Sequence, residues 1–148
     1  ETILEIGTCI GISSAYVDAA LHANNKGELI SLERCDALVP FINQNWKVLG
    51  VKHAQVRGGD ITQLLNEIID EGHVIDMVFD DENHHEQPTL DKFEQLLPHL
   101  VLPTLYVFDD IQWSDGMKRA WNRIKQHKHV AVSIALGNPS LRFGVCII

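Results

Sequence analysis

Acidic side chains follow two apolar segments of the chain, and their types suit the chemistry of a metal site. The first group, Asp80 to His85, comes directly after the run 74–79, and the second, Asp109-Asp110, follows the run 105–108. If these runs are neighbouring parallel strands, their carboxyl ends share the edge of the sheet at which ligands bind. Carboxylate oxygens suit Mg²⁺ or Ca²⁺, whereas a histidine ligand favours manganese, iron or zinc. The alternative is a solvated acidic rim that only aids solubility.

A turn with two glycines lies near the start of the chain. Gly7 and Gly11 separate the strand-like run 3–6 from the helix-like run 12–23. Glycine allows positive φ angles and a close approach of the backbone to a ligand. Glu5 is unusual within its run, because a buried strand rarely contains a carboxylate. The G-x-G-x-x-G spacing of a dinucleotide site is absent, and an ordinary turn without a ligand remains the alternative.

Two more acids stand at the ends of expected strands. Glu33 ends the run 29–32, where an acid accepts hydrogen bonds from ribose hydroxyls in nucleotide-binding sheets. Asp60 follows Gly58-Gly59 and suits the N-cap of the next helix. The alternatives are a solvated strand end for Glu33 and a purely structural cap for Asp60.

Strand-like and helix-like segments alternate along the whole chain, and this order predicts the fold. We expect strands at 3–6, 29–32, 54–56, 74–79, 105–108, 130–134 and 143–148, and helices at 12–23, 36–49, 60–72, 89–97 and 117–124. Such alternation indicates a parallel sheet with helices on both faces. The last two strands, joined through Gly137, Asn138 and Pro139, have no helix between them, which predicts an antiparallel last strand. The predicted fold is therefore α/β, doubly wound and mostly parallel, with seven strands.

Two details of this prediction concern packing. Asp36 is the expected cap of the second helix, Gly50 its stop, and its inward face is expected to carry Leu38, Ile42, Trp46 and Leu49. The last strand is expected next to the fifth strand, with segment 142–148 largely buried because Phe143, Val145, Ile147 and Ile148 are apolar.

The spacing of the motifs resembles that of a known family, the class I S-adenosylmethionine-dependent methyltransferases. The residues that carry the resemblance are Glu5-Ile6-Gly7, Gly11, Glu33 and Gly59-Asp60. The resemblance runs through nearly the whole chain and includes the closing strand pair. Cys9 stands where the usual motif has a third glycine.

The resemblance implies S-adenosylmethionine as cofactor and a role for each matching residue. Gly7 and Gly11 would pass close to the methionine part, Glu33 would bind the ribose hydroxyls, Asp60 would meet the adenine amino group, and Glu5 would orient the amino end. The fold implied is the Rossmann-like methyltransferase fold.

The acidic segments are similar to the metal site of divalent-cation-dependent O-methyltransferases. By this resemblance Asp81, Asp109 and Asp110 would hold Mg²⁺ or another divalent cation. His84, beside them, would serve as the general base, since its ordinary pKa lies near neutrality. The implied reaction is methyl transfer to a hydroxyl of a small molecule.

Composition bounds the class of protein. With 148 residues, 45% hydrophobic and 22% charged, the chain is expected to be one globular domain over 1–148, and its start at a strand suggests that an N-terminal helical extension precedes it. A net charge of −8 argues against nucleic acid as a partner. No apolar run is long enough for a bilayer, so no membrane partner is expected.

The three cysteines are widely spaced and form no C-x-x-C pair. A cytoplasmic location is therefore expected, with a homodimer as a possible assembly. Two alternatives to a methyltransferase remain open. One is a nicotinamide-dependent oxidoreductase, which the absent G-x-G-x-x-G disfavours. The other is a degenerate methyltransferase fold that binds without catalysing, a reading that Cys9 supports.

Overall fold

The computed structural model describes residues 1–138 and 142–148, so Pro139 of the expected final turn lies outside the described residues. The chain forms a seven-stranded sheet in the order β3-β2-β1-β4-β5-β7-β6. The chain divides into two compact units, Glu1–Ile75 and Asp76–Ile148. The α/β class, the seven strands and the antiparallel last strand are confirmed.

The elements follow one another in the expected order. The strands are β1 Thr2–Ile6, β2 Glu28–Glu33, β3 Ala54–Gly58, β4 Ile75–Asp80, β5 Leu100–Phe108, β6 Val132–Gly137 and β7 Arg142–Ile147. The helices are α1 Ile12–Asn24, α2 Val39–Leu49, α3 Ile61–Asp70, α4 Glu86–Leu96 and α5 Asp115–Ile124, with short 3₁₀ turns at Asp36–Leu38 and Leu97–His99.

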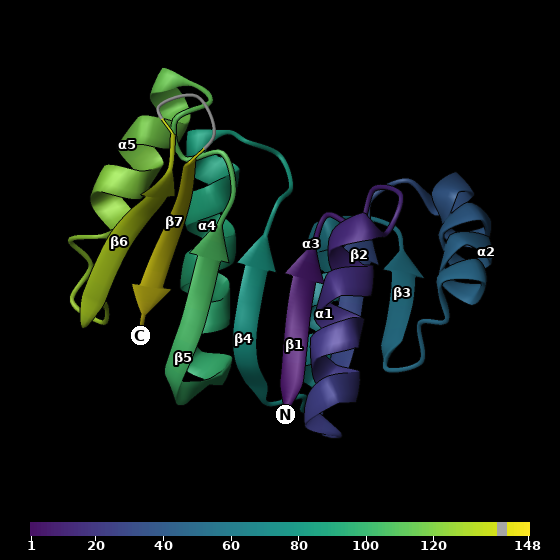
Figure 1. Ribbon diagram of the computed structural model, residues 1–148. Helices are drawn as coiled ribbons and strands as arrows, with labels where there is room; N and C mark the ends of the chain where they lie inside the picture. Colours follow the sequence, from purple (N-terminus) through teal and green to yellow (C-terminus); the bar gives the residue numbers. More distant parts are fainter. Residues whose placement is uncertain (139–141) are drawn as a thin grey trace. The chain divides into compact units, whose positions relative to one another are not determined.

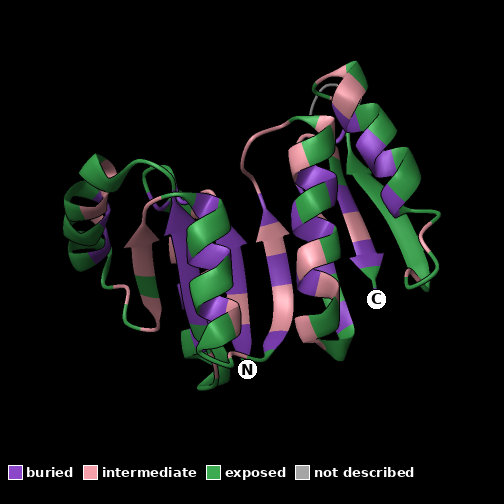
Figure 2. Cartoon of the chain, turned by 180° about the vertical axis from the view of Figure 1, so that it is seen from behind, coloured by how far each residue is buried: buried purple, intermediate pink, exposed green. Residues whose placement is uncertain are grey.

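The first unit is built on three parallel strands. β2 pairs with β1 and β3 on its two sides, with Leu29 opposite both Ile3 and Ala54. Helices α1 and α3 lie on opposite faces of these strands (Figures 1 and 2). Because both faces are covered, β2 is an almost continuous apolar run, and Leu29, Ile30 and Leu32 are fully buried.

The start of α2 differs from the expected one. Asp36 opens a 3₁₀ turn and does not cap a helix, and α2 begins at Val39. Proline is tolerated only in the first turn of a helix, so Pro40 fixes the start close to itself. Gly50 ends α2 in the left-handed conformation, as expected.

The inward face of α2 is narrower than predicted. Ile42 and Trp46 are buried, but Leu49 is 61% exposed, so its assignment to the core is wrong. Because α2 packs beside β3, an edge strand of the sheet, only one stripe of its side chains reaches the interior.

The second unit contains the closing strand pair. β7 runs antiparallel to both β5 and β6, and Ile147 lies opposite Leu105 on one side and Val132 on the other. Helices α4 and α5 lie together on one face (Figures 1 and 2). Phe93 of α4 packs edge-on against Tyr106 at 5.5 Å. A Cβ on Gly144 of β7 would lie 2.5 Å from the Trp121 ring of α5, so Gly144 is what lets this ring approach the sheet.

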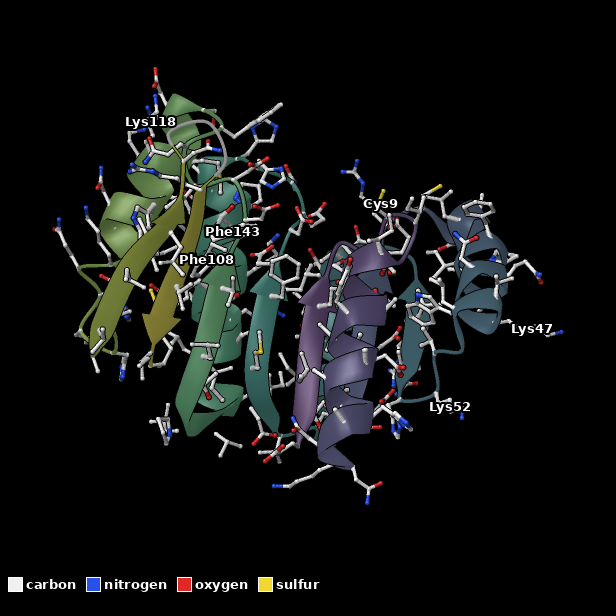
Figure 3. All side chains as sticks on the ribbon, viewed as in Figure 1. Cys9, Lys47, Lys52, Phe108, Lys118 and Phe143 are labelled. Carbon is white, nitrogen blue, oxygen red and sulfur yellow. The ribbon has the colours of Figure 1, made fainter. Side chains whose placement is uncertain are left out.

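The prediction that the last strand is largely buried is correct for only one of its two faces. Gly144, Cys146 and Ile148 are buried, whereas Phe143 and Ile147 are 39% and 40% exposed. Successive side chains of a strand point to opposite faces, and α4 and α5 cover one face only. Phe108 of β5 lies opposite Gly144, on the covered face, so Phe143 points to the other face of the sheet; Figure 3 labels both phenylalanines.

Several element boundaries also differ from the predicted ones, and the largest difference is in β5, which begins at Leu100 and not at Leu105. Helix α4 begins at Glu86, three residues before the expected Thr89, because Pro88 falls within the first turn, where proline is tolerated. Strand β6 spans Val132–Gly137 and not 130–134, since its pairing with β7 continues to Gly137. Among the described residues, no helix combines the length and apolar character needed to cross a membrane.

Candidate functional site

The turn between β1 and α1 has the backbone conformation that its glycines predict. Gly7 and Gly11 have φ angles of 103° and 80°, and Cys9 between them also has a positive φ, 52°. Helix α2 holds this turn, because Trp46 Nε1 donates to the Gly11 carbonyl at 3.1 Å and Asn45 Nδ2 donates to the Ile10 carbonyl at 3.1 Å. The conformation of the turn is therefore supported by α2 as well as by its own glycines.

Gly11 is required by packing as well as by conformation. A Cβ at this position would lie 2.2 Å from Trp46 Nε1, which is closer than any real contact. The sequence marked Trp46 only as a core residue, and nothing in its spacing indicated that its ring closes over the turn.

Glu33 ends β2 in a buried position at the edge of the sheet. Its two carboxylate oxygens accept hydrogen bonds from the backbone N–H groups of Cys9 and Cys35, each at 2.8 Å. Figure 3 shows Cys9 on the turn beyond the carboxyl end of β1. A carboxylate has about four acceptor sites, so this oriented group retains acceptor capacity for a ligand.

Glu5 is fully buried and belongs to a network of hydroxyl groups. Its carboxylate accepts hydrogen bonds from Ser13 at 2.5 Å, from Ser14 and from Ser31. Thr8 Oγ1 lies 2.6 Å from the Ser31 hydroxyl. The network ties β1, β2 and the start of α1 together. Sequence reasoning found the carboxylate but missed the serines, although a buried acid always requires donors.

Asp60 caps α3, as predicted from its position. Its side chain accepts a hydrogen bond from the backbone N–H of Gln63 at 3.0 Å. Gly59 before it has a φ of 145°, and Asp60 itself is exposed at the end of β3. The contact with adenine stays a prediction.

The acidic segments after β4 and β5 lie side by side, as expected for adjacent strand ends. The backbone N–H of Asp109 donates to the Asp80 carbonyl at 2.9 Å. Asp81, His84 and Asp109 each offer one ligand atom, and these atoms lie within 4.8 Å of one another. Asp110, the third predicted ligand, is not in this group, and its backbone N–H donates to Asp109 Oδ1 at 2.7 Å.

The acidic side chains of this region differ in whether a lysine or arginine pairs with them. Lys92 is buried and pairs with Asp80 at 2.7 Å and Glu82 at 3.2 Å. In the part of the chain that the structure describes, no lysine or arginine forms an ion pair with Asp81 or Asp109. Burial, followed by the nearby charge of Asp81, raises the pKa of Asp109 to about 6.

His84 is directed toward the unbalanced acids. Its Nε2 lies 3.4 Å from Asp81 Oδ1 and, among the described residues, makes no well-aligned hydrogen bond although it is buried. The Asp81 carboxylate raises the pKa of His84. The ring centroid of Trp113 lies 6.4 Å from that of His84, and Trp113 is 68% exposed. A half-buried imidazole thus lies beside an exposed aromatic ring.

A family model decides what kind of domain this is. The model of a methyltransferase domain matches residues 4–111, which include most of β1, all of β2 to β5 and every site residue described above except Trp113. The chain belongs to this methyltransferase family. No curated protein matches the sequence of this methyltransferase.

Solved structures show the same fold as this methyltransferase. An O-methyltransferase from Bacillus cereus, in complex with S-adenosylhomocysteine, is 20% identical with a TM-score of 0.81, over 99% of this chain and 74% of that one. TomG, an O-methyltransferase from Streptomyces achromogenes in complex with S-adenosylmethionine, is 22% identical with a TM-score of 0.79, over 99% and 72%. A cofactor-bound protein from MTB is 19% identical with a TM-score of 0.83, over 99% and 72%. At these identities the likeness concerns the fold, which is the Rossmann-like methyltransferase fold.

The predicted site residues of the methyltransferase thus fall into two groups, one in each unit. Glu5, Gly7, Gly11, Glu33 and Asp60 belong to the first unit, and Asp81, His84, Asp109 and Asp110 belong to the second. Within the first group, the Gly7–Gly11 turn contacts Glu33 through Cys9. Cys35, Trp46 and the three serines around Glu5 are additions that the structure makes to the predicted set.

Proposed function

We propose that this methyltransferase binds S-adenosylmethionine at the carboxyl edge of β1, β2 and β3, and transfers its methyl group to a hydroxyl of a small molecule. The orientation of Glu33 carries this proposal. Two backbone N–H groups hold a buried carboxylate that keeps free acceptor sites. Such an acid at the end of the second strand suits the two hydroxyls of a ribose.

The turn fits the cofactor for steric and conformational reasons. Gly7 has a positive φ and no side chain, so the backbone can pass close to a bound molecule. Cys9 differs from the usual glycine, but its backbone already adopts a left-handed conformation and its side chain is exposed. Glu5 would act through the serines that it fixes, because those hydroxyls occupy its oxygens.

We further propose that Asp81 and Asp109 hold a divalent cation, with His84 close enough to be a third ligand or the general base. The support is that, among the described residues, no lysine or arginine pairs with either carboxylate, and the buried His84 Nε2 has no well-aligned hydrogen-bond partner. An imidazole within the set favours manganese, iron or zinc over calcium. We favour His84 as the base, because a cation on Asp81 would remove the charge that raises the pKa of His84. The ring would then be neutral near pH 7 and able to accept a proton.

The chemistry expected is an in-line displacement. S-adenosylmethionine would supply a methyl group on a sulfonium centre, and a divalent cation held by Asp81 and Asp109 would lower the pKa of the acceptor hydroxyl. The residues of the chain supply positioning. Glu33 and the turn bind and orient the donor, His84 accepts the acceptor's proton, and Trp113 offers an aromatic surface for a flat or ring-shaped acceptor.

Calorimetry with two different ligands tests the identity of the cofactor. S-adenosylhomocysteine and NADH are titrated separately into the whole domain under reducing conditions. We expect binding of S-adenosylhomocysteine in the micromolar range and no heat from NADH. Binding of NADH alone would favour an oxidoreductase, and binding of neither at millimolar concentration would favour a degenerate module.

An acceptor screen tests the second half of the proposal. The protein is incubated with S-adenosylmethionine, Mn²⁺ and single phenolic or sugar compounds, and release of S-adenosylhomocysteine is measured. We expect turnover only with compounds that carry a free hydroxyl, and their methoxy analogues serve as controls. Turnover of amines but not of hydroxyl compounds would contradict O-methylation.

A further inference from the structure

Two thiols lie at the rim of the proposed cofactor site. Cys9 belongs to the turn after β1, and Cys35 belongs to the loop after β2, 26 residues later in the sequence. Both side chains are exposed. Their backbone N–H groups donate to the two oxygens of one carboxylate, that of Glu33, each at 2.8 Å. The shared acceptor therefore makes these two loops close neighbours.

The third cysteine of the chain is of a different kind. Cys146 lies in β7, on the face of the sheet that α4 and α5 cover, and is fully buried. Burial raises the pKa of its thiol to about 12. Since the thiolate is the reactive form, Cys146 is protected from oxidants, whereas the two thiols beside Glu33 are open to them. Cys146 thus serves as an internal control, a thiol that is expected not to react with the oxidant.

We propose that Cys9 and Cys35 form a reversible disulfide that closes the cofactor site. The consequence for the cofactor rests on the proposed function, but the disulfide itself does not. A disulfide needs Cα atoms about 4.4–6.8 Å apart. Loops that share a single hydrogen-bond acceptor can reach this range by a small movement, without unfolding either strand.

The bridge would act on Glu33 directly. Its two ends are the residues whose N–H groups hold the carboxylate, so the sulfur atoms would lie across the same group. The acceptor sites left for a ribose would then be covered. Cys9 also lies between Gly7 and Gly11, in the segment where the backbone must approach the ligand, and a tether there removes its freedom to adjust.

The chemistry requires a peroxide as the oxidant. The thiolate of one cysteine attacks an oxygen of hydrogen peroxide, which breaks the O–O bond, leaves a sulfenic acid and, after protonation of the departing hydroxide, releases one water. The second thiol attacks this sulfur, forms the S–S bond and expels a second water. Each sulfur loses one electron overall, and one peroxide is reduced to two waters. A dithiol such as dithiothreitol reverses the reaction by exchange.

The experiment follows the covalent state and cofactor binding in parallel. The whole domain is treated with hydrogen peroxide, digested without reductant and analysed by mass spectrometry. The same sample is titrated with S-adenosylhomocysteine before oxidation, after oxidation and after dithiothreitol. Cys35→Ser is the test variant, because serine keeps the backbone N–H to Glu33 and removes the thiol.

We expect a linked peptide that joins Cys9 to Cys35 and lacks two hydrogens, with Cys146 still free. S-adenosylhomocysteine affinity should fall by about tenfold or more on oxidation, and dithiothreitol should restore it. In Cys35→Ser, peroxide should produce no peptide that links positions 9 and 35. Because the bridge cannot form, the affinity of this variant for S-adenosylhomocysteine should show no fall that is due to a bridge and that dithiothreitol reverses.

Several results would overturn the proposal. One is the absence of the linked peptide in a protein that binds S-adenosylhomocysteine when reduced. Another is a linked protein whose affinity is unchanged. If the reduced protein does not bind S-adenosylhomocysteine at all, the proposed function fails, and the claim of cofactor control fails with it. The linked peptide then reports separately on the thiol pair.

Discussion

Asp109 and Asp80 end adjacent strands, yet the chain treats their charges differently. Asp80 is buried beside Lys92, which offsets part of the burial that raises the pKa of Asp80. Asp109 has Asp81 and His84 near its carboxylate and accepts a hydrogen bond from the backbone N–H of Asp110, and its pKa is raised to about 6. A charge that the fold leaves unbalanced costs stability unless a ligand neutralises it. The candidate metal group is therefore expected to oppose folding when no metal is present.

The first prediction concerns the pH dependence of stability in EDTA. The folded-state pKa of Asp109, about 6, exceeds the unfolded value near 4. The folded state therefore binds more protons between these values, and this contribution to stability is lost as pH rises from about 4 to about 6. Asp109→Asn should raise the free energy of unfolding at pH 7.5 by about 1–2 kcal/mol, after allowance for solvent screening. The gain should vanish near pH 4.

Urea denaturation at both pH values measures this effect. Asp115→Asn is the control, because the exposed Asp115 carboxylate pairs with Lys118 and its pKa is lowered. This control should give no stabilisation at pH 7.5. Equal stability of wild type and Asp109→Asn at pH 7.5 would mean that Asp109 bears no unbalanced charge.

The second prediction concerns the metal itself. Mn²⁺ should raise the melting temperature of the wild type, by about 5–10 °C at about 100 times the dissociation constant, because it binds the folded state. The double variant Asp81→Asn with Asp109→Asn should lose this rise. Asp91→Asn on the exposed side of α4 should keep it. Asp110→Asn tests whether Asp110 contributes to metal binding, because Asp110 was a predicted ligand but does not belong to the group of Asp81, His84 and Asp109. An equal rise in the double variant would place any bound metal elsewhere.

Some site residues could be predicted from the sequence and others could not. Glu33 and Asp109 follow apolar runs directly and Asp81 lies one residue further on, so their position at strand ends could be predicted. The hydroxyls around Glu5 and the two backbone N–H groups that hold Glu33 depend on which loops meet. Pairings between loops that are distant in sequence leave no periodic signal.

At the scale of elements, the turn after β1 depends on a helix from elsewhere in the chain. Helix α2 contributes the Trp46 ring and the Asn45 amide, which bond the carbonyls of Gly11 and Ile10. The ring fits because Gly11 has no Cβ. The shape of the proposed cofactor turn is thus a property of α2 as much as of the glycines.

The third prediction separates packing from backbone conformation. Gly11→Ala should lower the free energy of unfolding by about 2–4 kcal/mol, through a positive φ and a clash with Trp46. Gly50→Ala is the matched control, because Gly50 also has a positive φ, 75°, but nothing lies within 4 Å of the added Cβ. Its cost should be about 1–2 kcal/mol. Chemical denaturation measures the free energy of unfolding of both variants. Equal losses would mean that the clash with Trp46 adds nothing to the cost of Gly11→Ala.

Element boundaries show where sequence patterns stop being sufficient. Prolines placed the true starts of α2 and α4, yet the apolar pattern had suggested other residues. Phe143 and Ile147 read as core residues because they are apolar, whereas the helices cover the opposite face of β7. Period and composition indicate that a strand has two faces, but only the assembled layers determine which face is buried.

At the scale of the whole molecule, the order of strands and helices along the chain was sufficient to predict the fold. Regular alternation predicted the parallel strands, and the missing helix before β7 predicted its antiparallel direction. What alternation did not predict is the open face of β5, β7 and β6. Apolar side chains there are about half exposed, namely Val132, Ile134, Leu136, Phe143, Ile147 and Leu105. Exposed apolar surface of this kind attracts other apolar molecules.

The fourth prediction concerns this face. The native protein should bind the dye ANS, and Ile134→Thr should reduce the fluorescence, while the free energy of unfolding changes by less than about 1 kcal/mol because the side chain is half exposed. Ser133→Thr, the neighbouring position on the other face of β6, should leave the fluorescence unchanged. An undiminished signal in Ile134→Thr would mean that the dye binds elsewhere.

The central claim is that Glu33 binds the donor, and calorimetric titration with S-adenosylhomocysteine tests it most directly. The proteins compared are the wild type, Glu33→Ala and Glu28→Ala, an exposed acid at the opposite end of the same strand. Melting curves without ligand check that both variants remain folded. We predict micromolar binding in the wild type and in Glu28→Ala, and binding weaker by about 1–3 kcal/mol in Glu33→Ala. Equal affinity in all three proteins, or no heat from the wild type at millimolar ligand, would contradict the account.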